Sequence, residues 1–326
     1  MMFPAGREPL VAIGFMVLGA SLIPAMNSLA KYLAGEYPAW QVVWARFLGH
    51  FIWMMLFFWA RRGPSLLRSA RPKAQTLRSL IFFVSNACFV TALPFVELAT
   101  ASSLMFTTPI IVTVLAVPLL RERVGLPRWL AIAVGFAGAL VIIRPGSDLF
   151  DPWALLVLVS ASYYAVYLIW TRRLTPVDSP ETQIVYTAAA GAVLTTLTVP
   201  WFAIAPDSFL DLAAFAGVGL VGALAHLCIV QALKRAPAST VTPIGYFELV
   251  TAVLLGYVLF GDLPDIATWV GAALIVGSGA WIVFRGHRRG GRPVPVPGSG
   301  SARSTPSVRS TLQEQESNLS MFRRTR

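Results

Sequence analysis

The feature that most constrains this chain is a succession of long apolar runs. A helix of about 20 apolar residues is just long enough to cross the hydrocarbon core of a bilayer, which is about 30 Å thick. Only 13% of the 326 residues are charged, roughly half the share in a soluble domain. The fold class predicted is therefore an all-α integral membrane protein with ten transmembrane helices. The ten runs lie at residues 10–32, 38–60, 78–97, 99–120, 127–145, 152–173, 182–203, 209–233, 237–260 and 266–284.

The predicted membrane topology explains the net charge of +11. If both ends of the chain are cytoplasmic, then all 26 Lys and Arg residues lie on the cytoplasmic side except Lys31, Arg46 and Arg144. This asymmetry follows the positive-inside rule. We therefore interpret the basicity as a topology signal and expect no nucleic-acid partner. The predicted location is the bacterial inner membrane, with several passes and both termini cytoplasmic.

The chain contains an internal repeat with an offset of 140 residues. The segment "NACFVTAL" (86–93) aligns with "HLCIVQAL" (226–233), and Trp129 aligns with Trp269. Each copy holds five predicted helices, and because five is odd the second copy enters the membrane upside down. Inverted repeats of this kind are typical of alternating-access transporters.

Four segments carry a resemblance to a known family: "SLAKYLAGEYPAWQVVWARFLGH" (28–50), "RERVGLPRWLAIAVGFAGALVIIRPG" (121–146), "APASTVTPIGY" (236–246) and "FGDLPDIATWVGAALIVGSG" (260–279). In them the chain resembles the drug/metabolite transporter superfamily, in its EamA type. The resemblance covers residues 10–285 and implies a ten-helix permease. The subgroup is similar to riboflavin and S-adenosylmethionine importers, but other members export amino acids and drugs. The resemblance therefore implies a transporter and leaves its substrate open.

Two further expectations concern packing. The small residues of "GFAGA" (135–139) and "GAALIVGSG" (271–279) predict a close contact between the fifth and tenth helices. Glu122 and Asp262 occupy matching positions at helix ends and are interpreted as structural anchors. The family pattern usually has Glu in the second copy, so Asp262 is a mild departure.

Polar side chains inside the predicted helices are the candidates for function, because an ionisable group at bilayer depth costs at least about 2.5 kcal/mol. Arg46 and His50 lie one turn apart on one face of the second helix. Asn86 lies in the middle of the third helix, and His226 occupies the equivalent place in the repeat. We predict that these four side chains bind substrate. Arg46 would bind an anionic or acceptor-rich group; the alternatives are an ion pair with Glu248 and snorkelling to the outer surface.

Two more helices contribute candidates. Ser160, Tyr163, Tyr167 and Trp170 recur at helical spacing, and Tyr163 and Tyr167 are predicted to bind substrate, packing being the alternative. In the ninth helix Tyr246 is a candidate for binding and Glu248 for proton coupling. These two lie about 200° apart on a regular helix, so both line one cavity only if Pro243 distorts the turn, and Glu248 is preferred.

The function predicted is secondary-active transport of a small polar metabolite, amino-acid-, vitamin- or nucleoside-like, by alternating access. The sequence has no nucleotide-binding loop and no metal-spaced cluster, so no cofactor, metal or enzymatic activity is predicted. The alternatives are an intramembrane enzyme with Glu248 and His226 as an acid–base pair, and a non-transporting membrane subunit. The expected partners are the solute, the lipid bilayer and protons as a candidate coupling ion. The oligomeric state, including a homodimer, stays open.

The predicted organisation has four parts. Residues 1–9 form a cytoplasmic N-terminus, 10–145 the first five-helix repeat and 152–285 the second, inverted repeat. Residues 286–326 are rich in Pro, Gly, Ser and Arg and are predicted to be a disordered, basic cytoplasmic tail.

Overall fold

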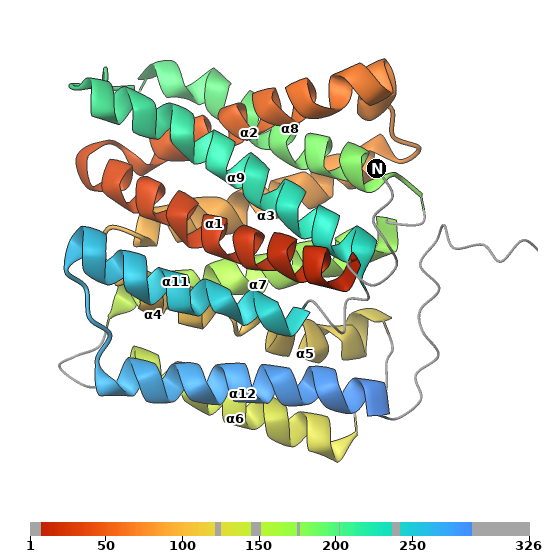
Figure 1. Cartoon of the computed structure of the whole chain (residues 1–326), viewed down its shortest axis with the longest axis vertical. Coiled ribbons are helices and arrows are strands. Elements are labelled where there is room, and N and C mark those ends of the chain that lie inside the picture. Colours follow the sequence, from red (N-terminus) through yellow and green to blue (C-terminus); the bar gives the residue numbers. More distant parts are fainter. Residues whose placement is uncertain are drawn as a thin grey trace, which may run out of the picture. The chain divides into compact units, whose positions relative to one another are not determined.

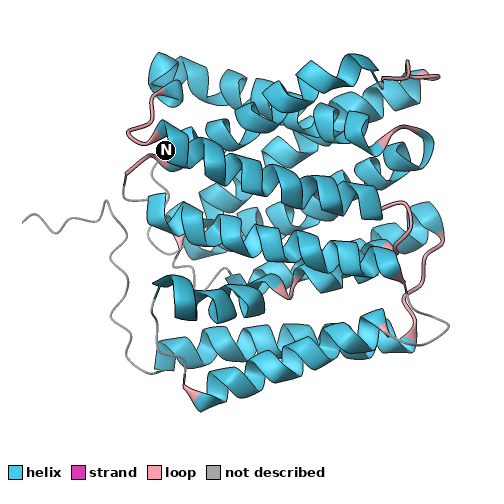
Figure 2. Ribbon diagram, turned by 180° about the vertical axis from the view of Figure 1, so that it is seen from behind, coloured by secondary structure: helices cyan, strands magenta, loops and turns pink. Residues whose placement is uncertain are grey.

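The computed structural model describes residues 8–120, 125–144, 151–174, 177–201, 203–236 and 242–288. Within these ranges the chain consists of helices joined by short loops (Figure 2). Predictions made for residues 1–7, for Glu122 and for the tail beyond residue 288 lie outside the described residues.

The helices of the first repeat follow the predicted order (Figure 1). They are α1 (Glu8–Glu36), α2 (Ala39–Arg62), α3 (Pro72–Ala92), α4 (Leu98–Met105), α5 (Thr108–Leu120) and α6 (Leu126–Ile143), with the short turn η1 (Gly63–Leu67) before α3. The helices of the second repeat are α7 (Pro152–Leu174), α8 (Pro180–Thr198), α9 (Phe209–Arg235), α11 (Phe247–Leu255) and α12 (Ile266–Arg288). The turns η2 (Val199–Trp201), η3 (Thr242–Tyr246) and η4 (Gly256–Phe260) complete it.

These elements make up the ten predicted membrane-crossing segments. Six helical stretches among the described residues are long and apolar enough to cross a membrane by length and composition. Three shorter apolar stretches fall in α6, in the segment from η3 to η4 and in α12. The helix α3 begins with polar residues, so only its second half is strongly apolar. The chain is thus an all-helical membrane protein.

Two segments predicted as continuous helices are interrupted. The fourth segment divides into α4 and α5 around Thr107, where the Thr107 and Thr108 hydroxyls donate to the carbonyls of Leu104 and Met105. Pro109 cannot donate the next helical hydrogen bond, which is the physical reason for the break. The ninth segment passes from η3 through α11 into a π-helical turn at η4.

The contacts between the two repeats reflect the inverted duplication. In chain order α1, α2, α3, α4–α5 and α6 correspond to α7, α8, α9, α11 and α12. α1 packs against α9, and the corresponding pair α7 and α3 also packs together. In the same way, the contact of α2 with α9 corresponds to that of α8 with α3. The contact of α1 with α11 corresponds to the contacts of α7 with α4 and α5. The helices α2, α3, α8 and α9 therefore meet at the interface between the repeats.

Glycines permit the closest helix contacts. A Cβ atom placed on Gly138 of α6 would lie 2.8 Å from the carbonyl oxygen of Gly271 on α12. A Cβ atom placed on Gly271 would lie 2.6 Å from the carbonyl oxygen of Gly138. The predicted contact between the fifth and tenth helices is thus confirmed, and Figure 1 shows α6 and α12 side by side. A second contact joins α2 and α9, where a Cβ on Gly219 would lie 2.5 Å from the Cα of Gly49.

We predict that Gly219→Ala destabilises the protein by about 1–3 kcal/mol, the usual effect of overpacking. The added methyl group would overlap backbone atoms of α2, which have no rotamer to escape into. Gly217→Ala on the same helix is the matched control, because its nearest neighbour is the flexible end of Leu29 at 3.3 Å. Thermal unfolding of both purified variants tests this prediction, and equal melting temperatures would contradict it.

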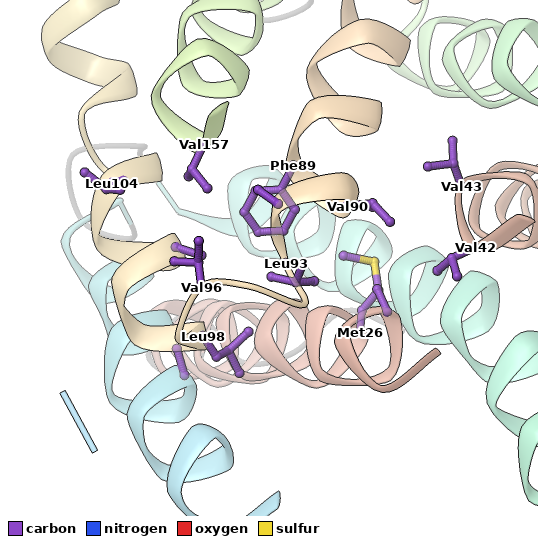
Figure 3. Close-up of a cluster of buried hydrophobic side chains, with 14 of the residues drawn as sticks. Met26, Val42, Val43, Phe89, Val90, Leu93, Val96, Leu98, Leu104 and Val157 are labelled. Carbon is purple, nitrogen blue, oxygen red and sulfur yellow. The ribbon is translucent and has the colours of Figure 1, made fainter. Parts of the chain in front are cut away.

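A large apolar cluster lies between α1, α2, α3, α4 and α7 (Figure 3). It includes Met26, Val42, Val43, Phe89, Val90, Leu93, Val96, Leu98, Leu104 and Val157. All of these side chains are apolar, and they are buried because the helices pack on one another here. The cluster borders the candidate site through Met26 and Phe47.

Ion pairs and hydrogen bonds close one end of the helix bundle, here called the Asp262 end. The Lys31 ammonium lies 2.5 Å from the Asp262 carboxylate and 3.0 Å from the Val96 carbonyl oxygen. Asp262 thus contacts the first repeat directly, in keeping with its interpretation as an anchor. Arg144 forms an ion pair with Asp265 at the same end.

The opposite end, here called the Asp178 end, is closed by a different polar cluster. The buried Asp178 carboxylate accepts hydrogen bonds from the Ser69 hydroxyl (2.6 Å), the Ala70 amide (3.0 Å) and the Gln75 amide (2.7 Å). Glu181 at the start of α8 forms ion pairs with Arg62 and Lys234. Polar contacts between the two repeats therefore occur at both ends of the bundle.

The stability of the Asp178 end should depend on pH. Burial raises the pKa of Asp178, but the hydrogen bonds from Ser69, Gln75 and Ala70 lower it more, so that its pKa lies below the usual value. A carboxyl whose pKa is lower in the folded state stabilises that state above the unfolded pKa of about 3.9, and this stabilisation is lost as the pH falls through the folded pKa.

We therefore expect Asp178→Asn to lower the melting temperature at pH 7 and to have a much smaller effect near pH 3. The exposed Asp207 supplies the control variant Asp207→Asn, because among the described residues its backbone amide is hydrogen-bonded but its carboxylate is not. Melting temperatures across the pH range check this expectation. A loss that is the same at every pH would show that the charge of Asp178 does not matter.

Candidate functional site

The centre of the site is the Arg46 guanidinium, which α2 places at the interface between the two repeats. With its oxygen turned toward Arg46, the buried Asn86 amide of α3 accepts hydrogen bonds from the guanidinium nitrogens at 3.1–3.2 Å. Among the described residues Arg46 forms no ion pair. A guanidinium held by a neutral amide keeps donors and an uncompensated charge for a further acceptor.

Two histidines lie beside it. The rings of His50 on α2 and His226 on α9 are 5.0 Å apart and meet edge to face. His226 donates from Nδ1 to the carbonyl oxygen of Gly222 at 3.0 Å, which fixes its ring. The Nε2 atom of His50 is buried and has no partner among the described residues. His50 therefore offers an unsatisfied polar atom next to the guanidinium.

Aromatic rings form the adjoining wall. Phe82 of α3 lies 4.8 Å from Tyr167 and 6.0 Å from Tyr164, and these two tyrosine rings of α7 stack at 5.6 Å. Phe47 of α2 contacts Phe82 at 5.8 Å. Such a cluster presents ring faces and edges to any planar group that enters between them.

A cavity of about 30 Å³ lies among these residues. This is room for about one water molecule and far less than the roughly 300 Å³ of a small-molecule site. The structure therefore holds the site in a closed conformation, and a metabolite enters only when helices move. The residues lining the cavity are Met26, Arg46, Phe47, His50, Phe82, Tyr167, Ile184, Thr187, Ala188 and His226.

The structure brings most of the sequence-predicted residues together. Arg46, His50, Tyr167 and His226 line the cavity, and Asn86 contacts Arg46. The Arg46–Asn86 contact joins the second helix to the third.

The structure places the remaining candidates elsewhere. Tyr163 is 41% exposed on the outside of the bundle, so it is directed away from the cavity. Tyr246 packs its ring on Phe106 at 5.2 Å, and its hydroxyl approaches Gly279 of α12. The sequence pattern predicts that Tyr163 binds substrate. In the structure its neighbour Tyr164 contacts the aromatic wall instead.

Glu248 is half-buried in the first turn of α11. The described residues give its carboxyl no hydrogen bond and no ion pair, so the alternative of an Arg46–Glu248 pair is not realised in this conformation. Tyr164 is within electrostatic range of both Glu248 and Arg46. Glu248 is not among the residues that line the cavity.

Other members of the site had only weak signals in the sequence. Phe82 precedes Asn86 by one helical turn, and Thr187 is one of several threonines in α8. Their positions depend on which faces of α3 and α8 meet, and this information is not contained in spacing within one helix.

The arrangement is suited to binding and not to bond-breaking chemistry. It combines a forked cation, an imidazole with an unsatisfied nitrogen and aromatic faces, at an interface that both repeats share. Such a set holds a planar, acceptor-rich or anionic group.

Comparison with known proteins agrees with this description. Residues 10–144 and 151–284 each match the EamA-like transporter family, so that the match covers both repeats. The S-adenosylmethionine uptake transporter of Rickettsia conorii is 28% identical over 275 residues, which are 84% of this chain and 93% of that protein. The riboflavin transporter of Vibrio cholerae is 28% identical over 280 residues, or 85% of this chain and 94% of the relative.

A solved structure described as the crystal structure of a protein has the same fold, with a TM-score of 0.59 at 21% identity, and the match covers 88% of this chain and all of that one. The alternative of an intramembrane enzyme built on Glu248 and His226 is wrong, because the family consists of transporters. The two matched repeats show that this chain belongs to the EamA-like transporter family.

Proposed function

We propose that the protein is a secondary-active transporter that moves a small polar metabolite by alternating access, with Arg46 as its principal substrate-binding group. The observation that carries this proposal is a cation at the interface of two inverted repeats that has no ion-pair partner in the described parts of the chain. A charge in the bilayer interior is costly and is retained where it binds a solute or a partner. The closed cavity around it is what an intermediate between two open states requires.

The charges of the site favour neutral or anionic substrates that carry an aromatic ring. Arg46 is cationic, and no carboxylate is found among the residues that line the cavity. S-adenosylmethionine carries a net positive charge and would be repelled there. Riboflavin is neutral and planar and has several acceptor atoms, so it fits both Arg46 and the rings of Phe82 and Tyr167. Between the substrates of the two relatives, the site thus favours a riboflavin-like compound.

Exchange across proteoliposomes tests the proposal. Purified full-length protein is reconstituted, and counterflow of labelled riboflavin, riboflavin phosphate and S-adenosylmethionine is measured against protein-free liposomes. We expect exchange of the flavins and little exchange of S-adenosylmethionine. Exchange of S-adenosylmethionine without that of either flavin would overturn the assignment of substrate charge.

We also propose that both termini and the Asp178 end of the bundle face the cytoplasm, since all but three Lys and Arg residues then lie on that side. A reporter active only in the cytoplasm, fused after Arg326, should be active, and one active only in the periplasm should be silent. The opposite pair of results would reverse the orientation.

A further inference from the structure

A second cation, Arg78 of α3, is fully buried next to the cavity on its Asp178 side. Its side chain is only 1% exposed, which makes it one of the most deeply buried large side chains described. In the sequence Arg78 is one of the cations on the predicted cytoplasmic side, and the binding site described above does not include it. A fully buried guanidinium is costly unless a counter-charge or a full set of acceptors compensates it.

The partners of Arg78 are neutral oxygens. One terminal nitrogen donates to the Thr171 hydroxyl at 2.9 Å and to the Gln183 side chain at 3.4 Å. The other donates to the Gln183 carbonyl oxygen at 2.5 Å and to the Thr187 hydroxyl at 2.7 Å. The Nε atom is buried and has no partner among the described residues.

Arg78 differs in this respect from the cations that close the two ends. Lys31, Arg144, Arg62 and Lys234 each pair with a carboxylate, whereas no described carboxylate forms an ion pair with Arg78. Asp178 is within electrostatic range, but its oxygens are occupied by Ser69, Ala70 and Gln75. Among the described residues Arg78 therefore has no carboxylate in direct contact, and it donates only to neutral oxygens.

The same side chains connect Arg78 to the cavity. Thr187 lines the cavity and accepts a hydrogen bond from Arg78. Tyr167 also lines the cavity, and its ring centre lies 4.9 Å from the Arg78 guanidinium carbon. Arg78, Phe82 and Asn86 follow one another at intervals of one turn on α3, so Arg78 and the Arg46–Asn86 pair are separated by about 12 Å along the helix.

We infer that Arg78 is a second substrate-binding group, which receives the anionic end of a charged substrate from Arg46 when the bundle opens at its Asp178 end. The hydrogen bonds of Arg78 to Gln183 and Thr187 join α3 to α8. The inference requires that opening at this end separates these two helices, which belong to different repeats. Anionic oxygens of the substrate then replace the neutral oxygens, and hydrogen bonds to charged acceptors are about twice as strong.

This inference rests on the proposed function, because it assumes transport past Arg46. Its test compares riboflavin phosphate with riboflavin, which share a ring system and differ by the charged phosphate group. Arg78→Gln removes the charge, Arg78→Lys keeps it without the forked geometry, and Thr171→Val removes one partner of Arg78 that does not line the cavity. KM is measured for both compounds in oriented membrane vesicles, from each face separately.

We expect Arg78→Gln to raise the KM for riboflavin phosphate at least tenfold from the Asp178 face, with little change for riboflavin and little change from the other face. Arg78→Lys, which keeps the charge but loses the forked geometry, should recover only part of the loss, and Thr171→Val should behave like the wild type. A purely structural role predicts instead that Thr171→Val resembles Arg78→Gln, or that both compounds and both faces are affected alike; either result overturns the inference.

The remaining outcomes are also decisive. If Arg78→Gln does not fold, Arg78→Lys is used in its place. The KM for riboflavin phosphate is divided by the KM for riboflavin, and a ratio equal to that of the wild type overturns the inference. If Arg46→Ala impairs transport while Arg78→Gln leaves every KM unchanged, only this inference fails. If the wild type carries neither compound, the proposed substrate class fails and the role of Arg78 fails with it.

Discussion

Replacing Arg46 by alanine should weaken substrate binding by about 10- to 100-fold, because hydrogen bonds to charged groups contribute about 1.5–3 kcal/mol and each 1.4 kcal/mol corresponds to a factor of ten. The guanidinium is the one charged side chain that lines the cavity when both histidines are neutral. Its removal also leaves the buried Asn86 amide without its partner. Isothermal titration of the purified variant with riboflavin measures the effect.

The conservative variant separates charge from geometry. Arg46→Lys keeps a positive charge but cannot present two parallel donors, so its affinity should lie between those of the wild type and Arg46→Ala. Arg46→Lys keeps a donor for Asn86 and should retain the wild-type melting temperature within a few degrees, whereas Arg46→Ala should melt lower because the Asn86 amide loses its partner. Unchanged affinity in Arg46→Ala would remove Arg46 from the binding site.

Glu248→Gln should abolish proton-driven accumulation of substrate while leaving exchange between preloaded liposomes measurable. Glu248 lies in the first turn of α11 and has no hydrogen bond or ion pair in the described structure. A carboxyl whose surroundings change as the bundle opens to one side and then the other binds protons with two affinities, which is what coupling requires. Flux is measured with and without an imposed pH gradient.

The control for Glu248 is the exchange assay itself, because it needs the binding site but no net driving force. Glu97 supplies a second control as Glu97→Gln, since this carboxyl lies at the Asp262 end and is hydrogen-bonded by Thr100. If Glu248→Gln accumulates substrate with an undiminished response to the gradient, Glu248 is not the coupling group.

The ten segments and the repeat could be predicted from the sequence because both depend on properties that accumulate along the chain. Each span needs about 20 apolar residues, and the duplication preserves spacing over 140 residues. The sequence also predicts that Asn86 and Arg46 lie in one site, because polar side chains in membrane helices face the interior of the bundle and not lipid.

Which of two neighbouring tyrosines enters the site could not be predicted. Ser160 and Tyr167 belong to two helical series, one through Tyr163 and one through Tyr164, and spacing alone does not separate them. The structure selects Tyr164, because Ser160 faces Ser85 of α3 and the following turns of α7 keep to that side. Tyr163 is consequently exposed.

Arg78 illustrates a different limit. In the sequence Arg78 follows five basic residues between the second and third apolar runs. Together with them it contributes to the charge asymmetry that predicts a cytoplasmic segment there. In the structure α3 begins at Pro72, earlier than the hydropathy boundary at residue 78, and the helix carries Arg78 into the bundle. Acceptors from α7 and α8, nearly a hundred residues or more away in sequence, make this burial possible.

The central claim is that one site at the interface of the repeats is reached alternately from the two faces of the membrane. Ala188 lines the closed cavity and is 2% exposed, so Ala188→Cys, in a background with Cys88 and Cys228 replaced by alanine, reports access to it. We predict that a membrane-impermeant thiol reagent modifies this cysteine from either face of oriented vesicles, and that bound substrate slows both reactions. Modification from one face alone, under all gradients and substrate concentrations, would contradict the account.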